Sequence, residues 1–299
     1  MDPQHTLVYS GAGPSSFTSS SGSGSRYSYE VIPGFFVHDA PLPEDTALPP
    51  RFGLVDESPE RWTTFVGRIG ELQAQAEGEG AGVKVFWLGR HGEGYHNVGE
   101  AKYGTKAWDD YYSKLNGDGE ITWGPDPELT PLGESQARAA HDLWQTEVTA
   151  GMPLPDSLYC SPLTRALRTN QITFDGVVDR SERRTTVVEY CREENGEHTC
   201  DRRRTRSYIR ATFPSFEIED GMTEEDELWD PVVRETKAQV DARARAVIGR
   251  VFGKDGAETY VSITAHGGWI NAFLRVVGHA PVRLPTGGAC MLLRCSYIC

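Results

Sequence analysis

The sequence predicts an α/β domain built as a three-layer sandwich, in which helices cover both faces of a mostly parallel central sheet. Short apolar runs of strand length alternate along the chain with longer segments whose apolar residues recur at helical spacing. Strands and helices that alternate in this way form parallel sheets, because each helix carries the chain back across one face. At 299 residues the chain is long enough for one such domain.

The predicted strands are short and bounded by glycine or polar residues. The first, at residues 83–89, has the apolar character of a strand that is buried on both faces. The others lie at residues 157–161, 185–191, 260–265 and 290–295. Helical patterns cover residues 58–76, 134–149, 231–252 and 268–277, and a further helix is expected to open after the second strand.

We place the boundary of the main domain at residue 58, so that it covers residues 58–299. Residues 1–57 are predicted to form an N-terminal arm. Within the arm, residues 10–25 are mostly serine and glycine, with little apolar surface to bury, and are expected to be flexible. The aromatic, proline-containing stretch that follows is expected to be extended and to pack along the domain.

Composition excludes several classes of protein. A net charge of -13 argues against a broad nucleic-acid interface, and no apolar run approaches the ~18 residues of a membrane helix. The N-terminus lacks the basic and then apolar segments of a secretory signal, and the six cysteines form no CxxC pairs. We therefore expect a cytoplasmic protein with reduced thiols and no nucleic-acid or membrane partner; a homodimer stays an open alternative.

Residues suited to phosphoryl transfer follow the predicted strands. Ligands of parallel sheets bind at the carboxyl ends of the strands, and four of these ends carry Arg90 with His91, Arg165, Glu193 and His266. A neutral imidazole can attack phosphorus, and arginine can donate twice to one phosphate. A carboxylic acid can then protonate the departing alkoxide. This scheme needs neither a metal nor another cofactor.

Four sequence blocks carry a family resemblance. FWLGRHGE at residues 86–93, followed by Asn97, resembles the signature of the histidine phosphatase superfamily in its phosphoglycerate mutase-like branch. LTPLG at residues 129–133, SPLTRA at 161–166 and AHGG at 265–268 resemble the later blocks, in the family's order. The stretch at residues 92–112 is most similar to fungal phosphoglycerate mutase-like proteins, many of which are phosphatases.

The resemblance implies a role for each matching residue. His91 would be the nucleophile, and Arg90, Arg165 and His266 would form the phosphate pocket. Glu193 would donate the proton, although the adjacent Glu194 leaves this assignment open. We prefer Glu193 because neighbours at a strand end point to opposite sides.

Further residues are expected to contact the substrate, namely Asn97, Gly92, Gly267, His198 and Arg203. Residues 180–210 hold nine arginines against six acidic residues, and this basic segment begins near the proposed donor. We expect it to line the mouth of the pocket and attract an anion, with Arg203 in contact. His96 is expected to pack locally. His198, Cys200 and Asp201 could suggest a metal, but no second pair of ligands is visible, so no metal is predicted.

These observations predict a metal-independent phosphatase that hydrolyses a small, anionic phosphorylated metabolite through a phosphohistidine on His91. One alternative is a phosphomutase of the phosphoglycerate type. The run after the proposed donor, at residues 194–204, departs from that of glycolytic mutases and weakens this alternative. Another is a catalytically weak protein of the same fold that binds a phosphorylated ligand. The sequence does not identify the substrate.

Overall fold

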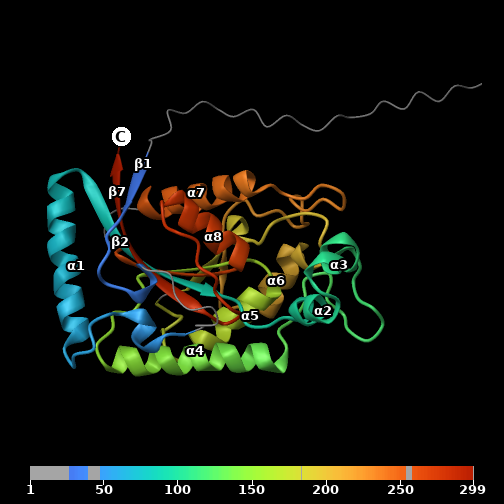
Figure 1. Ribbon diagram of the computed structural model, residues 1–299, viewed down its shortest axis with the longest axis horizontal. Helices are drawn as coiled ribbons and strands as arrows, with labels where there is room; N and C mark the ends of the chain where they lie inside the picture. The colour runs from blue at the N-terminus through green and yellow to red at the C-terminus, as the bar shows by residue number, and fades with distance from the viewer. Residues whose placement is uncertain (1–26, 40–47, 183, 254–257, 299) are drawn as a thin grey trace, which may run out of the picture.

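A single sheet forms the centre of the protein (Figure 1). The computed structural model describes residues 27–39, 48–182, 184–253 and 258–298, and within them seven strands pair in the order β1-β7-β2-β6-β3-β4-β5. The run from β2 to β5 in this order is parallel, and β7 lies antiparallel between β2 and β1. The mostly parallel sheet is thus confirmed. The strands are β1 (Tyr27–Val31), β2 (Ala81–Arg90), β3 (Ser157–Cys160), β4 (Thr185–Val187), β5 (Glu217–Ile218), β6 (Tyr260–Ala265) and β7 (Ala289–Ile298).

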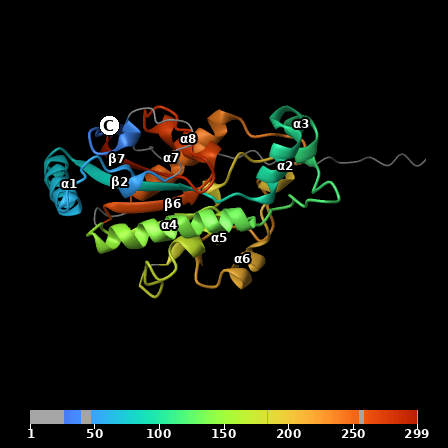
Figure 2. The same cartoon turned by 60° about the horizontal axis from the view of Figure 1, so that its bottom comes forward.

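Helices cover both faces of this sheet, as expected (Figure 2). α7 and α8 pack on one face and α1 and α4 on the other, with α5 beside α4. α2 and α3 lie beyond the carboxyl end of β2, and α6 packs against α5. Within the described ranges, no helix is both long and apolar enough to cross a bilayer. The helices are α1 (Arg61–Gly78), α2 (Tyr95–Tyr103), α3 (Thr105–Asp110), α4 (Pro131–Thr149), α5 (Thr164–Thr173), α6 (Arg206–Thr212), α7 (Lys237–Gly253) and α8 (Gly267–Val276).

β2 shows why the centre of the sheet is buried on both sides. Its six central residues are all buried. Because side chains alternate along a strand, Val83, Val85 and Trp87 join the core beneath α1 and α4. Phe86 and Leu88 join the core beneath α7 and α8. The strand therefore needs apolar residues at consecutive positions, which is the pattern that predicted it.

The helix predicted at residues 231–252 is shorter than expected, because α7 begins at Lys237. The Asp230 carboxylate accepts hydrogen bonds from the backbone N–H groups of Val232 and Val233. Such a side-chain contact offers the backbone an alternative to helix. Both valines are exposed, so a helix over these residues would gain no apolar burial to stabilise it. Residues 230–236 instead form a loop that reaches the cavity described below.

The strand predicted at residues 185–191 is also shorter than expected. β4 ends at Val187, and Glu189–Cys191 form one turn of 3-10 helix. The turn closes with a hydrogen bond of 3.1 Å from Cys191 N–H to Val188 O. It redirects the chain so that the carboxylate of Glu193 meets the first turn of α8.

The described parts of the N-terminal arm pack onto the domain. β1 adds an edge strand through its antiparallel pairing with β7. Phe36, Phe52 and Leu54 are buried in the same apolar cluster as α1. The serine- and glycine-rich segment at residues 10–25 lies outside the described residues, and the boundary at residue 58 stays a prediction.

Candidate active site

A polar cavity of about 230 Å³ opens where β2, β3 and β6 end, beside α2 and α3. Its lining comes from segments far apart in the chain, as expected for the carboxyl ends of parallel strands. The residues predicted from the sequence that line it are Arg90, His91, Asn97, Arg165, Glu193 and His198.

His91 lies directly after β2, and its ring is buried. Its Nδ1 is 2.6 Å from the carbonyl oxygen of Gly92. A carbonyl oxygen only accepts hydrogen bonds, so Nδ1 carries the proton and Nε2 keeps its lone pair. Burial, followed by the positive charges of Arg165 and Arg90, lowers the pKa of His91 well below its usual range. The ring is therefore a neutral imidazole with one nucleophilic nitrogen.

His266 brings a second imidazole beside His91. It follows β6 and precedes α8, and the centroids of the two rings are 5.0 Å apart. Its Nε2 lies 2.7 Å from Oγ of Ser161, which follows β3. Its Nδ1 is buried and has no hydrogen-bond partner among the described residues. Two histidines some 175 positions apart in the chain thus meet at one point, as the motifs predict, although His266 is fully buried and does not itself line the cavity.

Two arginines surround this pair. The Arg90 Nη1 donates to the carbonyl oxygen of Leu284 at 2.7 Å. Arg165, in the first turn of α5, donates from Nη1 to Cys200 O at 2.6 Å and from Nη2 to the Asp201 carboxylate at 2.8 Å. The Nε atoms of both arginines are buried and lack partners within the described ranges. The two guanidinium groups supply positive charge next to a neutral imidazole, an arrangement that suits a phosphate ester.

Glu193 faces the cavity from the loop after β4. Its Oε2 accepts a hydrogen bond of 3.0 Å from Gly268 N–H, and its Oε1 accepts one of 3.1 Å from Glu194 N–H. Burial, with a further contribution from Asp201, raises the pKa of Glu193. A carboxyl group whose pKa is raised holds its proton at a higher pH than usual, which suits a proton donor. Glu194 also lines the cavity, but its carboxylate lies 3.8 Å from Arg234.

Asn97 and His198 occupy the wall of the cavity. The Asn97 Oδ1 accepts from Gly94 N–H at 3.0 Å, which caps the start of α2 and fixes the orientation of the amide. The His198 Nε2 lies 3.7 Å from the Asp109 carboxylate. Both residues lie where a substrate bound near His91 would pass, so both remain candidates for substrate contact.

The two glycines predicted as substrate contacts lie behind the cavity and do not line it. Gly92 donates its N–H to Thr169 Oγ1 at 3.0 Å, so this group is already used. A Cβ at Gly92 would lie only 2.3 Å from Gly133 O, which shows that the first and second sequence blocks pack backbone against backbone. A Cβ at Gly267 would lie 3.6 Å from the Arg90 Nε. Close packing thus requires a glycine at position 92, whereas a Cβ at position 267 would make an ordinary contact, and neither glycine lies in the lining of the cavity.

The structure also contradicts the prediction that Arg203 contacts the substrate, because its side chain is buried and does not line the cavity. Its Nε donates to both carboxylate oxygens of Glu189, and its Nη2 donates to the carbonyl oxygens of Thr223 and Glu225. The neighbouring guanidinium groups of Arg202 and Arg204 lie over aromatic rings, and neither lines the cavity. The basic segment thus stabilises its own loops.

Several residues that line the cavity were missed by the sequence analysis, namely His96, Glu100, Trp108, Asp109, Arg234 and Gly268. His96 was expected to pack locally, yet it lines the cavity with its ring centroid 5.3 Å from that of His91. Its spacing from Glu100, four residues along α2, places the two on one helix face and could have indicated this. Arg234 reaches the cavity from the loop before α7 and donates to Asp201 at 3.0 Å. No motif marks that loop.

The cluster of His198, Cys200 and Asp201 does not suit a metal ion. Their donor atoms lie within 4.8 Å of one another. However, one carboxylate oxygen of Asp201 accepts from Arg165 and the other from Arg234. Burial also raises the pKa of the Cys200 thiol well above its usual range. The cluster is therefore part of an ion-pair network.

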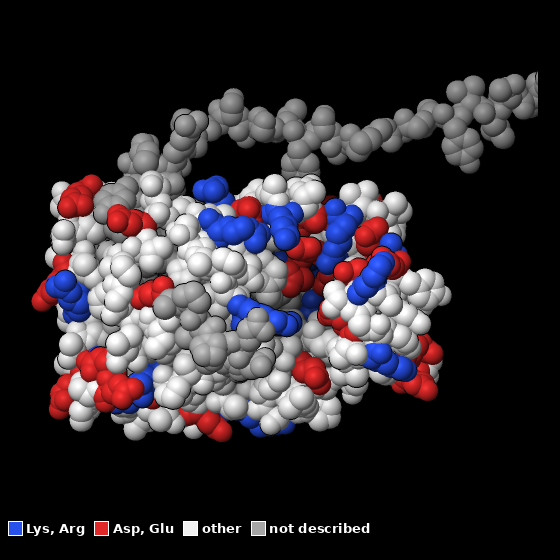
Figure 3. Space-filling model, in the orientation of Figure 1, with Lys and Arg blue, Asp and Glu red and all other residues white. Residues whose placement is uncertain are grey.

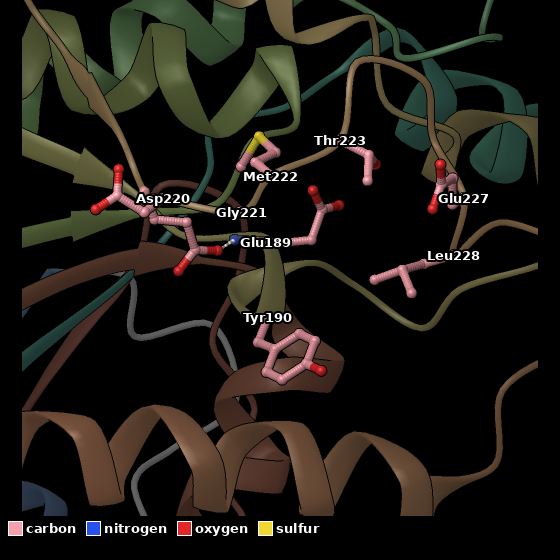
Figure 4. Close-up of a pocket in the computed structure, with 9 residues that line it drawn as sticks. Glu189, Tyr190, Asp220, Gly221, Met222, Thr223, Glu227 and Leu228 are labelled. Atoms are coloured by element: carbon pink, nitrogen blue, oxygen red, sulfur yellow. Dashed lines mark hydrogen bonds between the residues drawn. The ribbon is translucent and has the colours of Figure 1, made fainter. Parts of the chain in front are cut away.

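A second cavity, of about 310 Å³, lies apart from these residues (Figure 4). It is lined by carboxylates and apolar groups, including Glu189, Tyr190 and Met222, and its described lining contains no basic side chain. The Glu189 carboxylate is already bound by Arg192 and Arg203. Such a lining would repel a phosphate, so the cavity around His91 is the better candidate for a phosphate site.

The fold and this cavity together define a class of protein. It is an α/β domain of the phosphoglycerate mutase-like type, in which the histidine after a central parallel strand lies beside a second histidine and two arginines. The chain belongs to the histidine phosphatase superfamily, because the sequence model of branch 1 of that superfamily matches residues 86–290.

Two named relatives agree with this assignment, and one solved structure is also similar to the chain. A protein of Arthroderma benhamiae named "Probable phosphoglycerate mutase" is 41% identical over 288 residues, which cover 89% of this chain and 84% of that protein. "Phosphomutase-like protein 3" of Candida albicans is 34% identical, over 69% of this chain and 64% of that protein. A solved mycobacterial glucosyl-3-phosphoglycerate phosphatase in complex with VO3 is 22% identical. It covers 64% of this chain and 79% of its own, with a TM-score of 0.38.

Proposed function

We propose that the protein is a metal-independent phosphatase that hydrolyses a small phosphorylated metabolite through a phosphohistidine on His91. The observation that carries this proposal is the position of the His91 ring beside a second imidazole and two guanidinium groups. The ring is neutral, its Nδ1 is held by the Gly92 carbonyl, and its free Nε2 belongs to a ring that lies beside His266 and two arginines.

In the first step, the lone pair of His91 Nε2 attacks phosphorus and the bond from phosphorus to the ester oxygen breaks. The departing alkoxide takes the proton of Glu193, whose raised pKa favours the protonated form. The His91 ring becomes positively charged as the N–P bond forms. Its Nδ1–H bond to Gly92 O stabilises that charge and keeps the ring oriented.

In the second step, the Glu193 carboxylate takes a proton from a water molecule, whose oxygen attacks phosphorus. The P–N bond then breaks, inorganic phosphate leaves, and His91 and Glu193 return to their starting states. Arg90, Arg165 and His266 bind the non-bridging oxygens throughout. Phosphate monoesters hydrolyse very slowly without an enzyme, so this electrostatic stabilisation supplies much of the rate enhancement.

Replacement of the nucleophile tests the proposal. His91→Ala should abolish the hydrolysis of p-nitrophenyl phosphate measured in EDTA, whereas His141→Ala, on α4 and outside the cavity, should retain it. Wild-type protein quenched during turnover of a ³²P-labelled ester should carry an acid-labile, alkali-stable label that the His91 variant lacks. Hydrolysis at the wild-type rate by the folded His91 variant would refute the proposal.

The names of the fungal relatives favour a second candidate, a phosphomutase. It shares the first step and differs in the acceptor, which is a hydroxyl of a second substrate in place of water. Incubation with 3-phosphoglycerate and a bisphosphoglycerate primer separates the two functions. A mutase yields 2-phosphoglycerate, whereas the proposed phosphatase yields free phosphate only.

A further inference from the structure

The cavity around His91 holds more acidic than basic side chains. Three arginines line it, and they are accompanied by five carboxyl side chains, which belong to Glu100, Asp109, Glu193, Glu194 and Asp201. In Figure 3, blue and red side chains both border the hollow between the main body and the lobe that α2 and α3 form. The arginines that could bind a phosphate are thus surrounded by acidic side chains.

Two of the three cavity arginines already form ion pairs with carboxylates of the protein. Asp201 lies between Arg165 and Arg234, at 2.8 Å and 3.0 Å respectively. Arg234 is also 3.8 Å from the Glu194 carboxylate. Among the described residues, Arg90 alone of the three cavity arginines has no carboxylate within ion-pair distance. Once Arg90 and Arg165 hold the phosphoryl group, no uncommitted arginine remains for a second anionic group.

The cavity histidines do not supply the missing positive charge. Burial lowers the pKa of His91, His96 and His198, so all three are neutral near pH 7. His96 is nine-tenths buried against the cavity, and its Nδ1 has no partner in the described part of the chain. It therefore offers a polar but uncharged contact.

Two carboxylates, by contrast, remain available. Glu100 on α2 and Asp109 on α3 have no Lys or Arg within ion-pair distance among the described residues. Glu100 accepts one neutral hydrogen bond from Thr105, and the Asp109 side chain is 55% exposed. Both line the same cavity as the nucleophile. A substrate that places its phosphoryl group on His91 extends the rest of its structure past these carboxylates.

We propose that the alcohol portion of the preferred substrate carries a positive charge, as in an aminoalkyl phosphate, and that Glu100 and Asp109 recognise this charge. Esters that carry a carboxylate or a second phosphate are disfavoured. This inference rests on the proposed phosphatase function and refines it. Each partly exposed charge pair changes the binding free energy modestly, so exchange of an ammonium for a carboxylate should change kcat/KM by about tenfold.

Three esters with one two-carbon skeleton provide the test: phosphoethanolamine, 2-hydroxyethyl phosphate and phosphoglycolate. We expect kcat/KM to fall in that order at low ionic strength, and the spread to shrink at high salt because screening weakens exposed charge pairs. The double variant E100Q/D109N should bring the ratio for phosphoethanolamine over phosphoglycolate close to one. Asp110→Asn is the matched control, since Asp110 follows Asp109 on α3 but pairs with Lys106 and does not line the cavity.

The outcomes separate the two levels of the proposal. Equal kcat/KM for the three esters, or a preference for phosphoglycolate, would overturn the charge preference and leave the phosphatase function intact. The wild-type ratio in the folded double variant would overturn the assignment to Glu100 and Asp109. Failure to hydrolyse these esters and p-nitrophenyl phosphate alike would refute the phosphatase function itself.

Discussion

Replacement of Glu193 by glutamine tests the proposed proton donor. The two side chains have nearly the same shape, and the glutamine amide oxygen can still accept the hydrogen bond that Gly268 N–H gives to Glu193 at 3.0 Å. The change removes the transferable proton and also one acceptor, because the amide NH2 cannot accept the hydrogen bond of 3.1 Å that Glu194 N–H gives to Glu193 Oε1. This second loss is the same for every substrate, so the comparison between leaving groups isolates the effect of the proton. A role limited to packing against α8 would leave the catalytic rate almost unchanged in this variant.

The size of the loss depends on the leaving group. General acid catalysis contributes ~10²–10⁴-fold, which corresponds to about 3–5 kcal/mol of transition-state stabilisation. An alkoxide needs the whole of this contribution because it is a poor leaving group. A nitrophenolate is stable in water near neutral pH and leaves without a proton. Glu193→Gln should therefore lower kcat/KM by at least about 100-fold for an alkyl phosphate and far less for p-nitrophenyl phosphate.

The assay compares the two esters in wild type, Glu193→Gln and Glu194→Gln. Because burial raises the pKa of Glu193, the alkyl ester should lose activity in wild type as the pH rises through that pKa. The glutamine variant should lose this limb of the pH profile. Equal losses on both esters would contradict a proton-donor role. A leaving-group-dependent loss in the Glu194 variant alone would transfer the role to Glu194, which also lines the cavity.

Three further changes test packing and titration. A Cβ in Gly133→Ala would lie 2.0 Å from a backbone oxygen, so the melting temperature should fall sharply, whereas Gly67→Ala, in open space on α1, should be neutral or stabilise by up to ~1 kcal/mol. Glu147→Ala leaves the indole N–H of Trp62 without its 2.7 Å partner and should cost about 3 kcal/mol in denaturant unfolding, more than Glu147→Gln. Burial lowers the pKa of His38 from 6.5 to about 4, so its neutral form stabilises the fold above pH 6.5. That contribution, about 3 kcal/mol, is lost as the pH falls toward 4, and the loss should be absent in His38→Gln.

The central elements could be predicted because their apolar patterns depend on burial alone. β2 and β6 are buried on both faces and α8 on one face, and each stands in the sequence within a few residues of its predicted position. β1 and β5 were missed because they lie at the edges of the sheet. There the pairing partner, rather than a continuous apolar run, determines the strand. The late start of α7 likewise depends on individual side chains: Asp230 holds the loop before the helix, and Thr236 and Gln239 exchange hydrogen bonds where the helix begins.

The reacting residues could be predicted for a related reason. His91, Arg165 and His266 each follow a predicted strand, and the parallel topology brings the ends of those strands to one edge of the sheet. Motif and topology therefore lead to the same location. His96 and Arg234 lie on a helix and a loop outside that rule, and their position depends on how the segment after β2 folds back over the sheet.

Charge shows most clearly where reasoning from sequence alone fails. The count of arginines in residues 180–210 predicted a basic mouth, but carboxylates that pair with these guanidinium groups reduce the positive charge that is left for a ligand. Arg203 is held by Glu189, and Arg234 by Asp201. What determines the character of the cavity is the set of charges left after such pairing, and beyond the phosphate pocket these are the carboxylates of α2 and α3. These carboxylates stand where a basic mouth was expected, and they are the reason a cationic phosphate ester provides the most informative comparison.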